Sequence, residues 1–392
     1  MKRREFITKS GIVSAGLIAG TSTLGAFSKN IGSNSTINIG VIGCGNRGGG
    51  LIPVLNQIEG VQVSAVCDIL PFNLENGLKR TQNKAKAYTD YQKLLDNKTV
   101  DAILIATPFS THAAIAIDAL DAGKHVYCEK TMAKGFNGID ELVKKVTASK
   151  TIFQTGHQYH SSKLYKHVVN MLQNGDIGEV ASIECQWNRN GNWRRPVADP
   201  SLERAINWRM YREYSGGLVA ELCSHQIDFA HWLLGENPKK IMGTGGINFW
   251  KDGRETFDNI HLLYEYPCGV KASFTCLTSN ALGDYQIKVQ GSKGTIQLDY
   301  TKAWIYHEKG HETKLGDVDG VSGATASPYL QGKGFAIEVD HIEPSKQALM
   351  DFRDCILNNQ QPISNVYTGA ETAKAVQLSL DAMYEETIQY WK

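Results

Sequence analysis

The chain has 392 residues, of which 42% are hydrophobic and 21% charged, and its formal net charge at pH 7 is +1. This composition is typical of a globular protein, and the length is enough for two domains of ordinary size. The near-neutral charge, with no basic tract interleaved with aromatic residues, argues against a nucleic-acid-binding protein.

Residues 1–35 differ from the rest of the chain. Arg3 and Arg4 precede a mildly apolar stretch over 11–27 that is rich in glycine, alanine, serine and threonine. A basic start and a weakly hydrophobic stretch are typical of an export signal, and the paired arginines resemble the twin-arginine type. We expect an export signal and linker over 1–35, a periplasmic mature protein, and no stable membrane span in it. The alternative is a chance Arg-Arg pair before a short buried helix.

Residues 36–157 alternate between strand and helix patterns. Strands are predicted at 37–42, 61–67, 101–106, 124–128 and 151–155. Near-continuous apolar strands that alternate with helices predict a doubly wound parallel sheet of the Rossmann type, covered on both faces.

A glycine-rich loop follows the first of these strands. Gly43, Gly45 and Gly48 have the spacing of a dinucleotide-binding turn, and Asp68 follows the second strand about 20 residues later. Gly43 permits the turn, Gly45 allows a pyrophosphate to approach, and Gly48 allows tight helix–strand packing, while the helix N-terminus offers free N–H groups. The Asp68 carboxylate can accept ribose hydroxyls and would repel a 2′-phosphate, which favours NAD over NADP. The alternative is an ordinary glycine-rich turn.

Polar residues also follow the third and fourth strands. In open α/β sheets ligands bind at the carboxyl ends of the strands, so residues 106–112 and 127–131 would face the cofactor. Lys130 at such an end can polarise a hydroxyl and support proton transfer. The alternatives are that His112 only caps a helix and that Lys130 is a solvated surface residue. The predicted cofactor-binding residues are Gly43, Cys44, Gly45, Asn46, Arg47, Gly48, Asp68, Thr107, Pro108, His112, Glu129 and Lys130.

After residue 158 the pattern changes to long strands in series. Strands are predicted at 179–188, 239–249, 257–266, 269–279, 284–291 and 294–307. Helices are predicted at 161–173, ending at Asn174-Gly175, and at 345–358 and 368–388, with a long loop over 308–340. Together they predict an α+β domain over 158–392 with a largely antiparallel open sheet.

The eight cysteines have no C-x-x-C spacing, and several lie in apolar strand patterns. They are interpreted as small buried hydrophobes rather than as disulfides or metal ligands. We therefore expect no metal site.

Glu221 and His225 form a second candidate site. They are four residues apart, which on an α-helix puts both on one face, where the carboxylate can fix the imidazole and raise its basicity. Such a base suits alcohol oxidation, because it takes the hydroxyl proton while hydride leaves carbon. The alternatives are a core helix with a hydrogen-bonded histidine, and a metal site with His231, whose spacing from His225 puts the two on different helix faces.

The order of these motifs resembles the Gfo/Idh/MocA oxidoreductase family from about residue 36 to the end of the chain. The resemblance implies a Rossmann domain, an α/β domain with an open sheet, homo-oligomers, and sugar or polyol substrates. It also implies a catalytic lysine from a Glu-Lys-Pro motif and an acid–base pair from Asp-x-x-x-His, which correspond to Lys130, Glu221 and His225. Two residues depart from the pattern: Thr131 replaces the usual proline and Glu221 the usual aspartate.

The segment 187–214 interleaves tryptophan and tyrosine with six arginines. Flat aromatic faces suit the C–H surfaces of sugars, and arginines donate to hydroxyls or carboxylates. The alternative is an arm that packs against a neighbouring subunit. The predicted substrate-binding residues are His157, Tyr159, Trp193, Trp208 and Tyr211, together with Lys130 and His225.

These features predict an exported NAD-dependent oxidoreductase that acts on a sugar or glycoside hydroxyl. Because free NAD is not expected outside the cytoplasm, the cofactor would be loaded before export and stay bound. Two alternatives stay open. One is a redox-neutral glycosidase of the kind found in the same family, which oxidises C3, eliminates the aglycone, adds water and reduces the ketone back. The other is a catalytically silent protein that binds NAD or a sugar.

Overall fold

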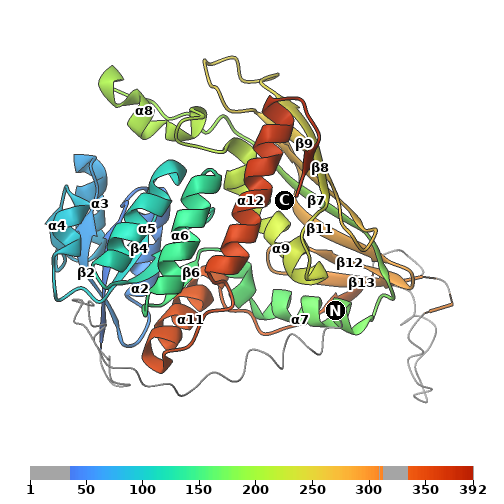
Figure 1. Cartoon of the computed structure of the whole chain (residues 1–392), viewed down its shortest axis with the longest axis horizontal. Coiled ribbons are helices and arrows are strands. Elements are labelled where there is room, and N and C mark those ends of the chain that lie inside the picture. The colour runs from blue at the N-terminus through green and yellow to red at the C-terminus, as the bar shows by residue number, and fades with distance from the viewer. Residues whose placement is uncertain (1–35, 309, 312–333, 392) are drawn as a thin grey trace, which may run out of the picture.

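The computed structural model describes residues 36–308, 310–311 and 334–391 (Figure 1). The predicted export signal over 1–35 and most of the predicted loop over 308–340 lie outside these residues. Within them, a parallel sheet flanked by helices lies beside a second, larger sheet, and helices pack between the two.

The first sheet has six parallel strands in the order β3–β2–β1–β4–β5–β6. They are β1 (Ile37–Ile42), β2 (Val61–Cys67), β3 (Lys86–Tyr88), β4 (Ala102–Ile105), β5 (His125–Cys128) and β6 (Phe153–Thr155). The predicted doubly wound parallel sheet is confirmed. Strand β3 was not predicted, because this short edge strand is partly exposed and has no apolar pattern.

Strand β4 shows why these strands are apolar at every position. Ala102 and Leu104 point to one side of the sheet, Ile103 and Ile105 point to the other, and all four are buried. Helices α2 and α3 cover the first side, and α4, α5 and α6 cover the second. Their bounds are α2 (Asn46–Leu55), α3 (Pro71–Arg80), α4 (Tyr91–Leu95), α5 (His112–Asp121) and α6 (Phe136–Ala148).

The C-terminal helices return to the first domain. Helix α11 (Pro344–Asn358) packs Phe352 edge-to-face against Tyr127 of β5, with ring centroids 5.7 Å apart. Helix α12 (Val366–Tyr384) begins in the core of the first domain and ends in that of the second (Figure 1). The boundary between 157 and 158 stays a prediction, and helices from beyond it complete the core of the first domain.

The second sheet has nine strands in the order β14–β13–β12–β11–β7–β10–β9–β8–β15. Among the described strands of this sheet only β7 and β10 pair in parallel, so the predicted largely antiparallel sheet is confirmed. The strands are β7 (Val180–Asn190), β8 (Lys240–Gly246), β9 (Asn259–Glu265), β10 (Lys271–Leu277), β11 (Ser279–Gly291), β12 (Gly294–Leu298), β13 (Ala303–His307), β14 (Phe335–Ile337) and β15 (Gln389–Tyr390). Helices α7 (Lys163–Asn174) and α9 (Ser224–Leu234) lie on the face toward the first domain (Figure 1).

The single strand predicted over 294–307 is two strands. A turn separates β12 from β13 because the Asp299 carboxylate accepts hydrogen bonds from the backbone N–H groups of Thr301 and Lys302, both at 2.7 Å. Strand β14 lies inside the predicted loop over 308–340 and pairs with β13. The predicted end of the helix at Gly175 is confirmed, since Gly175 takes a left-handed backbone with φ of 84°.

The cysteines are all unpaired in the structure, and most are buried. Cys268 is exposed and Cys355 is partly buried, so the prediction of buried hydrophobes holds for the other six. Among the described residues, no helix is long and apolar enough to cross a membrane, and no group of three or more histidine, cysteine or acidic residues could hold a metal ion.

Truncation of Phe352 tests whether α11 is an integral part of the first domain. We expect Phe352→Ala to lower the free energy of unfolding by about 3–5 kcal/mol, because the ring is fully buried and leaves a cavity. The matched control is Phe249→Ala at an exposed ring, where we expect a loss below about 1.5 kcal/mol. Equal losses in urea unfolding of the two variants would show that α11 is only loosely attached.

Candidate active site

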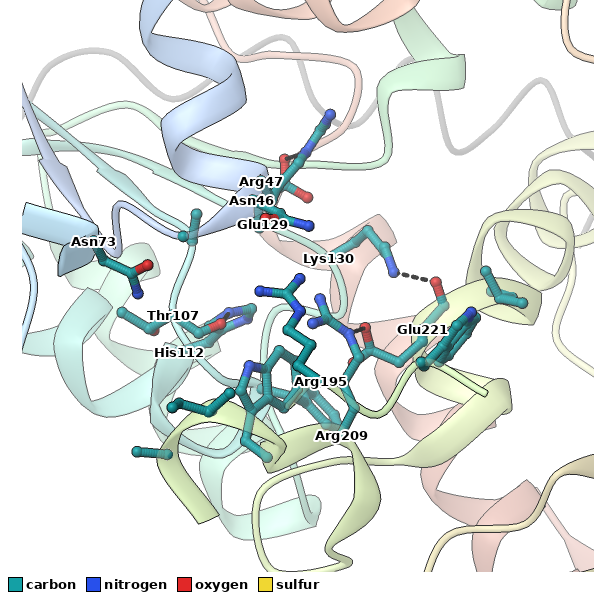
Figure 2. Close-up of a pocket in the computed structure, with 18 of the residues that line it drawn as sticks. Asn46, Arg47, Asn73, Thr107, His112, Glu129, Lys130, Arg195, Arg209 and Glu221 are labelled. Atoms are coloured by element: carbon teal, nitrogen blue, oxygen red, sulfur yellow. Dashed lines mark hydrogen bonds and ion pairs between the residues drawn. The ribbon is translucent and has the colours of Figure 1, made fainter. Parts of the chain in front are cut away.

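A cavity of about 610 Å³ opens where the carboxyl ends of β1, β2, β4 and β5 meet the second domain (Figure 2). It contains both sequence-predicted sites. The predicted residues on its wall are Gly45, Asn46, Arg47, Thr107, His112, Glu129, Lys130, Trp193, Trp208, Glu221 and His225. Figure 2 shows Lys130 and Glu221 on one side of this space and Thr107 and His112 on the other.

The glycine loop has the geometry that the sequence predicts. Gly43 has a φ of 90°, and a Cβ there would lie 2.6 Å from the carbonyl oxygen of Ala106. A Cβ on Gly48 would lie 1.8 Å from the carbonyl oxygen of Gly43, so only glycine lets α2 approach the turn this closely. Helix α2 begins at Asn46 with no side-chain cap and no acidic residue in its first turn. Its N–H groups are therefore free for an anion, which fits the pyrophosphate of a dinucleotide.

Asp68 lies behind the cavity wall. Its Oδ2 accepts a hydrogen bond from the backbone N–H of Cys44 at 2.7 Å, and its Oδ1 accepts one from that of Leu70 at 2.9 Å. The carboxylate thus holds the glycine loop to the end of β2. Each oxygen keeps a second lone pair, so ribose binding by Asp68 stays a prediction. Sequence reasoning missed the residues that follow it on the wall, Leu70, Phe72 and Asn73.

Lys130 reaches across the cavity to the second domain. Its ammonium donates to the backbone carbonyl of Glu221 at 2.6 Å and to that of Ala220 at 3.2 Å (Figure 2). Burial lowers the pKa of Lys130, and the charges of Glu221 and Glu129 oppose that shift. The alternative of a solvated surface lysine is therefore wrong. The following peptide bond, Lys130–Thr131, is cis although threonine stands where the family pattern has proline.

His112 joins two of the loops that line the cavity. Its Nδ1 lies 2.9 Å from the carbonyl oxygen of Thr131, and its Nε2 lies 2.9 Å from that of Thr107. Burial lowers the pKa of His112, while these two carbonyls oppose the shift. His112 therefore holds the loop after β4, which contains Thr107, against the loop after β5, which contains Lys130.

Glu129 and Arg47 form an ion pair at the start of α2. The Arg47 Nε donates to Glu129 Oε1 at 2.7 Å, and its Nη1 donates to Ser345 Oγ of α11 at 3.2 Å. Helix α11 therefore supports the glycine loop, through a contact between residues too distant in sequence to be predicted.

The predicted pairing of Glu221 with His225 is wrong. The Glu221 carboxylate accepts from Arg209 Nε at 2.8 Å instead. Residues 219–223 form a π-helical turn, in which residues four apart no longer lie on one face as they do in an α-helix. Burial alone would raise the pKa of Glu221, but Arg209 and Lys130 lower it below the ordinary value, so the group is a carboxylate.

His225 is a buried, neutral imidazole on the cavity wall. Its ring packs against those of Tyr159 and Trp187, with centroids 5.2 and 5.8 Å apart, and its Nδ1 has no hydrogen-bond partner among the described residues. Burial lowers the pKa of His225 well below its usual range, and the charge of Lys130 adds to the shift. At neutral pH the ring is therefore able to accept a proton.

Three more histidines surround Asp228 behind His225. His160 Nε2 lies 2.9 Å from Asp228 Oδ2, and His157 Nδ1 lies 3.8 Å from Oδ1, while Thr372 donates to Oδ1 at 3.2 Å. Burial lowers the pKa of His157 and of His231 to about 4. This buried cluster packs behind His225 and supports its ring. Sequence reasoning did not predict the role of Asp228, because no spacing rule shows that α9 lies next to residues 157–160.

Three predicted substrate residues do not line the cavity. His157 and Tyr159 lie behind His225, because the chain turns its Gln158 side chain to the wall instead. The Tyr211 hydroxyl donates to Glu203 Oε1 at 2.9 Å, which holds the Tyr211 ring within the segment 187–214, called the arm below. The wall residues that sequence reasoning did not place in the site are Gln158, Trp187, Arg189, Arg195 and Arg209.

Two family profiles match the chain and together cover more than half of it. One describes an oxidoreductase family with an NAD-binding Rossmann fold and matches residues 37–157, and the other describes the GFO/IDH/MocA C-terminal domain and matches 165–297. The chain belongs to the Gfo/Idh/MocA oxidoreductase family. Its first domain is accordingly an NAD-binding domain, in agreement with the free N–H groups of α2 beside the glycine loop.

The most similar proteins include enzymes of known reactions. A 2,7-anhydro-N-acetylneuraminate hydratase of Escherichia coli is 28% identical over 70% of this chain and 74% of its own length. A myo-inositol 2-dehydrogenase of Thermotoga maritima is 26% identical over 67% of this chain and 75% of its own. The solved structure of a levoglucosan dehydrogenase with NADH and levoglucosan matches 91% of this chain and 99% of its own, with a TM-score of 0.72 and 17% identity, which supports the fold alone.

Two glycines of α2 offer a direct test of the nucleotide site. We expect Gly48→Ala to weaken NAD binding by more than about tenfold, because the new Cβ collides with the Gly43 backbone and displaces the helix N-terminus. Gly50→Ala is the control, since a Cβ there meets nothing within 4 Å, and it should leave the affinity unchanged and stabilise the helix by up to about 1 kcal/mol. Calorimetric titration with NAD measures both, and full affinity in Gly48→Ala would contradict this account of the loop.

The buried histidines predict a loss of stability in mild acid. His157 and His231 are neutral when folded but take up protons near pH 6.5 when unfolded, so stability is complete above that pH and falls as the pH drops toward about 4. Each contributes up to roughly 3 kcal/mol. His231→Gln should reduce this fall, whereas Gln at the exposed His167 should not. Urea unfolding at several pH values between 6.5 and 4 measures it, and a flat profile would refute the prediction.

Proposed function

We propose that this protein is an NAD-dependent oxidoreductase that removes hydride from a ring hydroxyl carbon of a sugar or glycoside. The observation that carries the proposal is the convergence of a neutral imidazole, His225, and an ammonium, Lys130, on one cavity with the glycine loop. The names of relatives support the substrate class, since they include inositol 2-dehydrogenases.

When bound, NAD supplies the hydride acceptor. His225 takes the hydroxyl proton, and because its Nδ1 is enclosed, Nε2 is the atom left for the substrate. Lys130 is fixed by two backbone carbonyls and directs its remaining N–H at the same hydroxyl oxygen, where it stabilises the negative charge that develops. Glu221 holds Arg209 and offsets the positive charge around Lys130.

The aromatic residues of the arm complete the binding site. Trp193 and Trp208 lie on the cavity wall, and Arg209 lies over the Trp208 ring at 4.1 Å from its centroid. Such a stacked arginine holds the ring in place and leaves its other face for the C–H surface of a sugar. This favours the substrate-binding interpretation of the arm over an arm that only contacts a neighbouring subunit.

A redox-neutral reaction is the second candidate. A relative at 28% identity is a hydratase, and a hydratase adds water without net oxidation. The same His225 and Lys130 would act in such a cycle, with oxidation and reduction balanced on one substrate. Product release without net accumulation of NADH would identify it.

Export and self-association complete the proposal. Arg3 and Arg4 support secretion by the twin-arginine route into the periplasm, with NAD loaded in the cytoplasm and retained. The family resemblance supports a homo-oligomer. Cell fractionation of the full chain with and without an Arg3→Lys, Arg4→Lys change, and light scattering of the purified protein, test these two points.

The test of function begins with protein purified from an exporting host without added cofactor. Denaturation should release NAD, and titration of the intact protein with a panel of glycosides should raise absorbance at the NADH band with one of them. Product without an absorbance change would favour the redox-neutral reaction. Tight sugar binding with neither absorbance change nor product would show a catalytically silent protein and refute the proposal.

Two substitutions test the assigned roles. His225→Asn and Lys130→Met should each lower kcat by roughly a hundredfold to ten-thousandfold, because each removes a group that moves or stabilises charge in the transition state. NAD affinity of His225→Asn should change by less than about threefold, which a folding defect would not permit. His167→Asn and Lys163→Met at exposed positions are the matched controls. A His225→Asn enzyme with full kcat would rule out His225 as the base.

A further inference from the structure

The cavity carries an excess of positive charge. Five cationic side chains and two carboxylates lie on its wall, and each carboxylate is already in an ion pair, Glu129 with Arg47 and Glu221 with Arg209. NAD brings two phosphate charges, partly offset by its own nicotinamide cation, and the N-terminus of α2 lies ready for those phosphates. The cations on the rest of the wall, Lys130, Arg189, Arg195 and Arg209, lie away from the N-terminus of α2 and are therefore available to the substrate.

Lys130, Arg189 and Arg195 are the wall cations that form no ion pair among the described residues, and of these Lys130 is held by two backbone carbonyls. The neighbours of Arg195 on the arm are paired, Arg194 with Glu203 and Asp252, and Arg204 with Glu213. The guanidinium of Arg195 has no hydrogen bond or ion pair in the described part of the chain, and burial and the charge of Arg209 lower its pKa. Arg189, also on the wall, instead lies over the Trp187 ring at 5.5 Å from its centroid.

The backbone holds Arg195 in this position. Its N–H donates to Asn207 Oδ1 at 2.8 Å, and its carbonyl accepts from Asn207 Nδ2 at 3.0 Å. Asn207 is buried and donates again to Glu203, so the anchor is fixed to the arm. Figure 2 shows the Arg195 and Arg209 side chains reaching from the arm into the cavity, with Lys130 beyond them.

We propose that Arg195 binds a carboxylate on the substrate, so that acidic sugars and their glycosides, such as uronates, are preferred over neutral ones. This rests on the proposed function and specifies its substrate class. A guanidinium pairs with a carboxylate through two parallel hydrogen bonds, and such a pair relieves the repulsion between Arg195 and Arg209.

The experiment compares matched sugars on the NAD-loaded protein. Methyl glucoside and methyl galactoside are tested against methyl glucuronide and methyl galacturonide, in both anomers, with a sugar 6-phosphate as a third arm. Binding is followed by the fluorescence of Trp193 and Trp208, and turnover by NADH absorbance and product analysis. We expect a uronate to bind at least about tenfold more tightly than its neutral partner.

The variants assign that preference to one residue. Arg195→Gln should weaken uronate binding by roughly tenfold to a hundredfold, Arg195→Lys should weaken it less, and neither should change neutral-sugar or NAD affinity by more than about twofold. Arg204→Gln, at an exposed pair on the same arm, is the matched control and should change nothing.

Three results would overturn the proposal. Equal affinity for neutral and acidic sugars would do so while leaving the proposed oxidoreductase intact if a neutral sugar is turned over. Loss of NAD affinity in Arg195→Gln would assign the residue to the cofactor phosphates. Tighter binding of the sugar 6-phosphate than of the uronate would show that Arg195 binds a phosphate rather than a carboxylate. If no sugar is converted, the proposed function fails, and the fluorescence affinities still decide the role of Arg195.

Discussion

The close approach of helix α2 to the turn after β1 is the constraint on which the site depends. A side chain at Gly48 would overlap the Gly43 carbonyl, so the helix can start beside the strand end only because glycine is there. That contact aims the N-terminus of α2 into the cavity, and the Cys44 N–H, held by Asp68, fixes the loop from the other side. Because Arg47 then reaches Glu129, the position of α2 also sets the loop that carries Lys130.

The ionisable side chains of the cavity are of two kinds, those that stay charged in ion pairs and those that burial keeps neutral. Cations and carboxylates stay ionised in pairs such as Arg47–Glu129 and Arg209–Glu221, since each pair offsets the cost of removing charge from water. His225 differs from them, because it has no close anion and burial keeps its imidazole neutral. The same low-polarity surroundings thus provide a base at neutral pH and a fixed positive side chain next to it.

Much of the fold and part of the site could be predicted from sequence. Period and spacing predicted most of the strands of both sheets and the glycine loop, because these depend on residues close together in the chain, but missed the short edge strands β3 and β14. Glu221 was misplaced because its helix has a π-turn, which no spacing rule reveals. Asp228, Ser345 and Gln158 act through contacts with distant segments, and side-chain direction in the turn at 157–160 decides which residue reaches the wall.

The return of α11 and α12 to the first domain bears on how the protein is made. Phe352, Val366 and Ala370 complete the core around strands that were synthesised more than 200 residues earlier. Domains usually fold in order as they leave the ribosome, but the nucleotide-binding half of this chain stays short of core residues until translation is almost finished. Until α11 and α12 emerge, the sheet lacks this apolar cover, and such incompletely packed surface favours aggregation of the nascent chain.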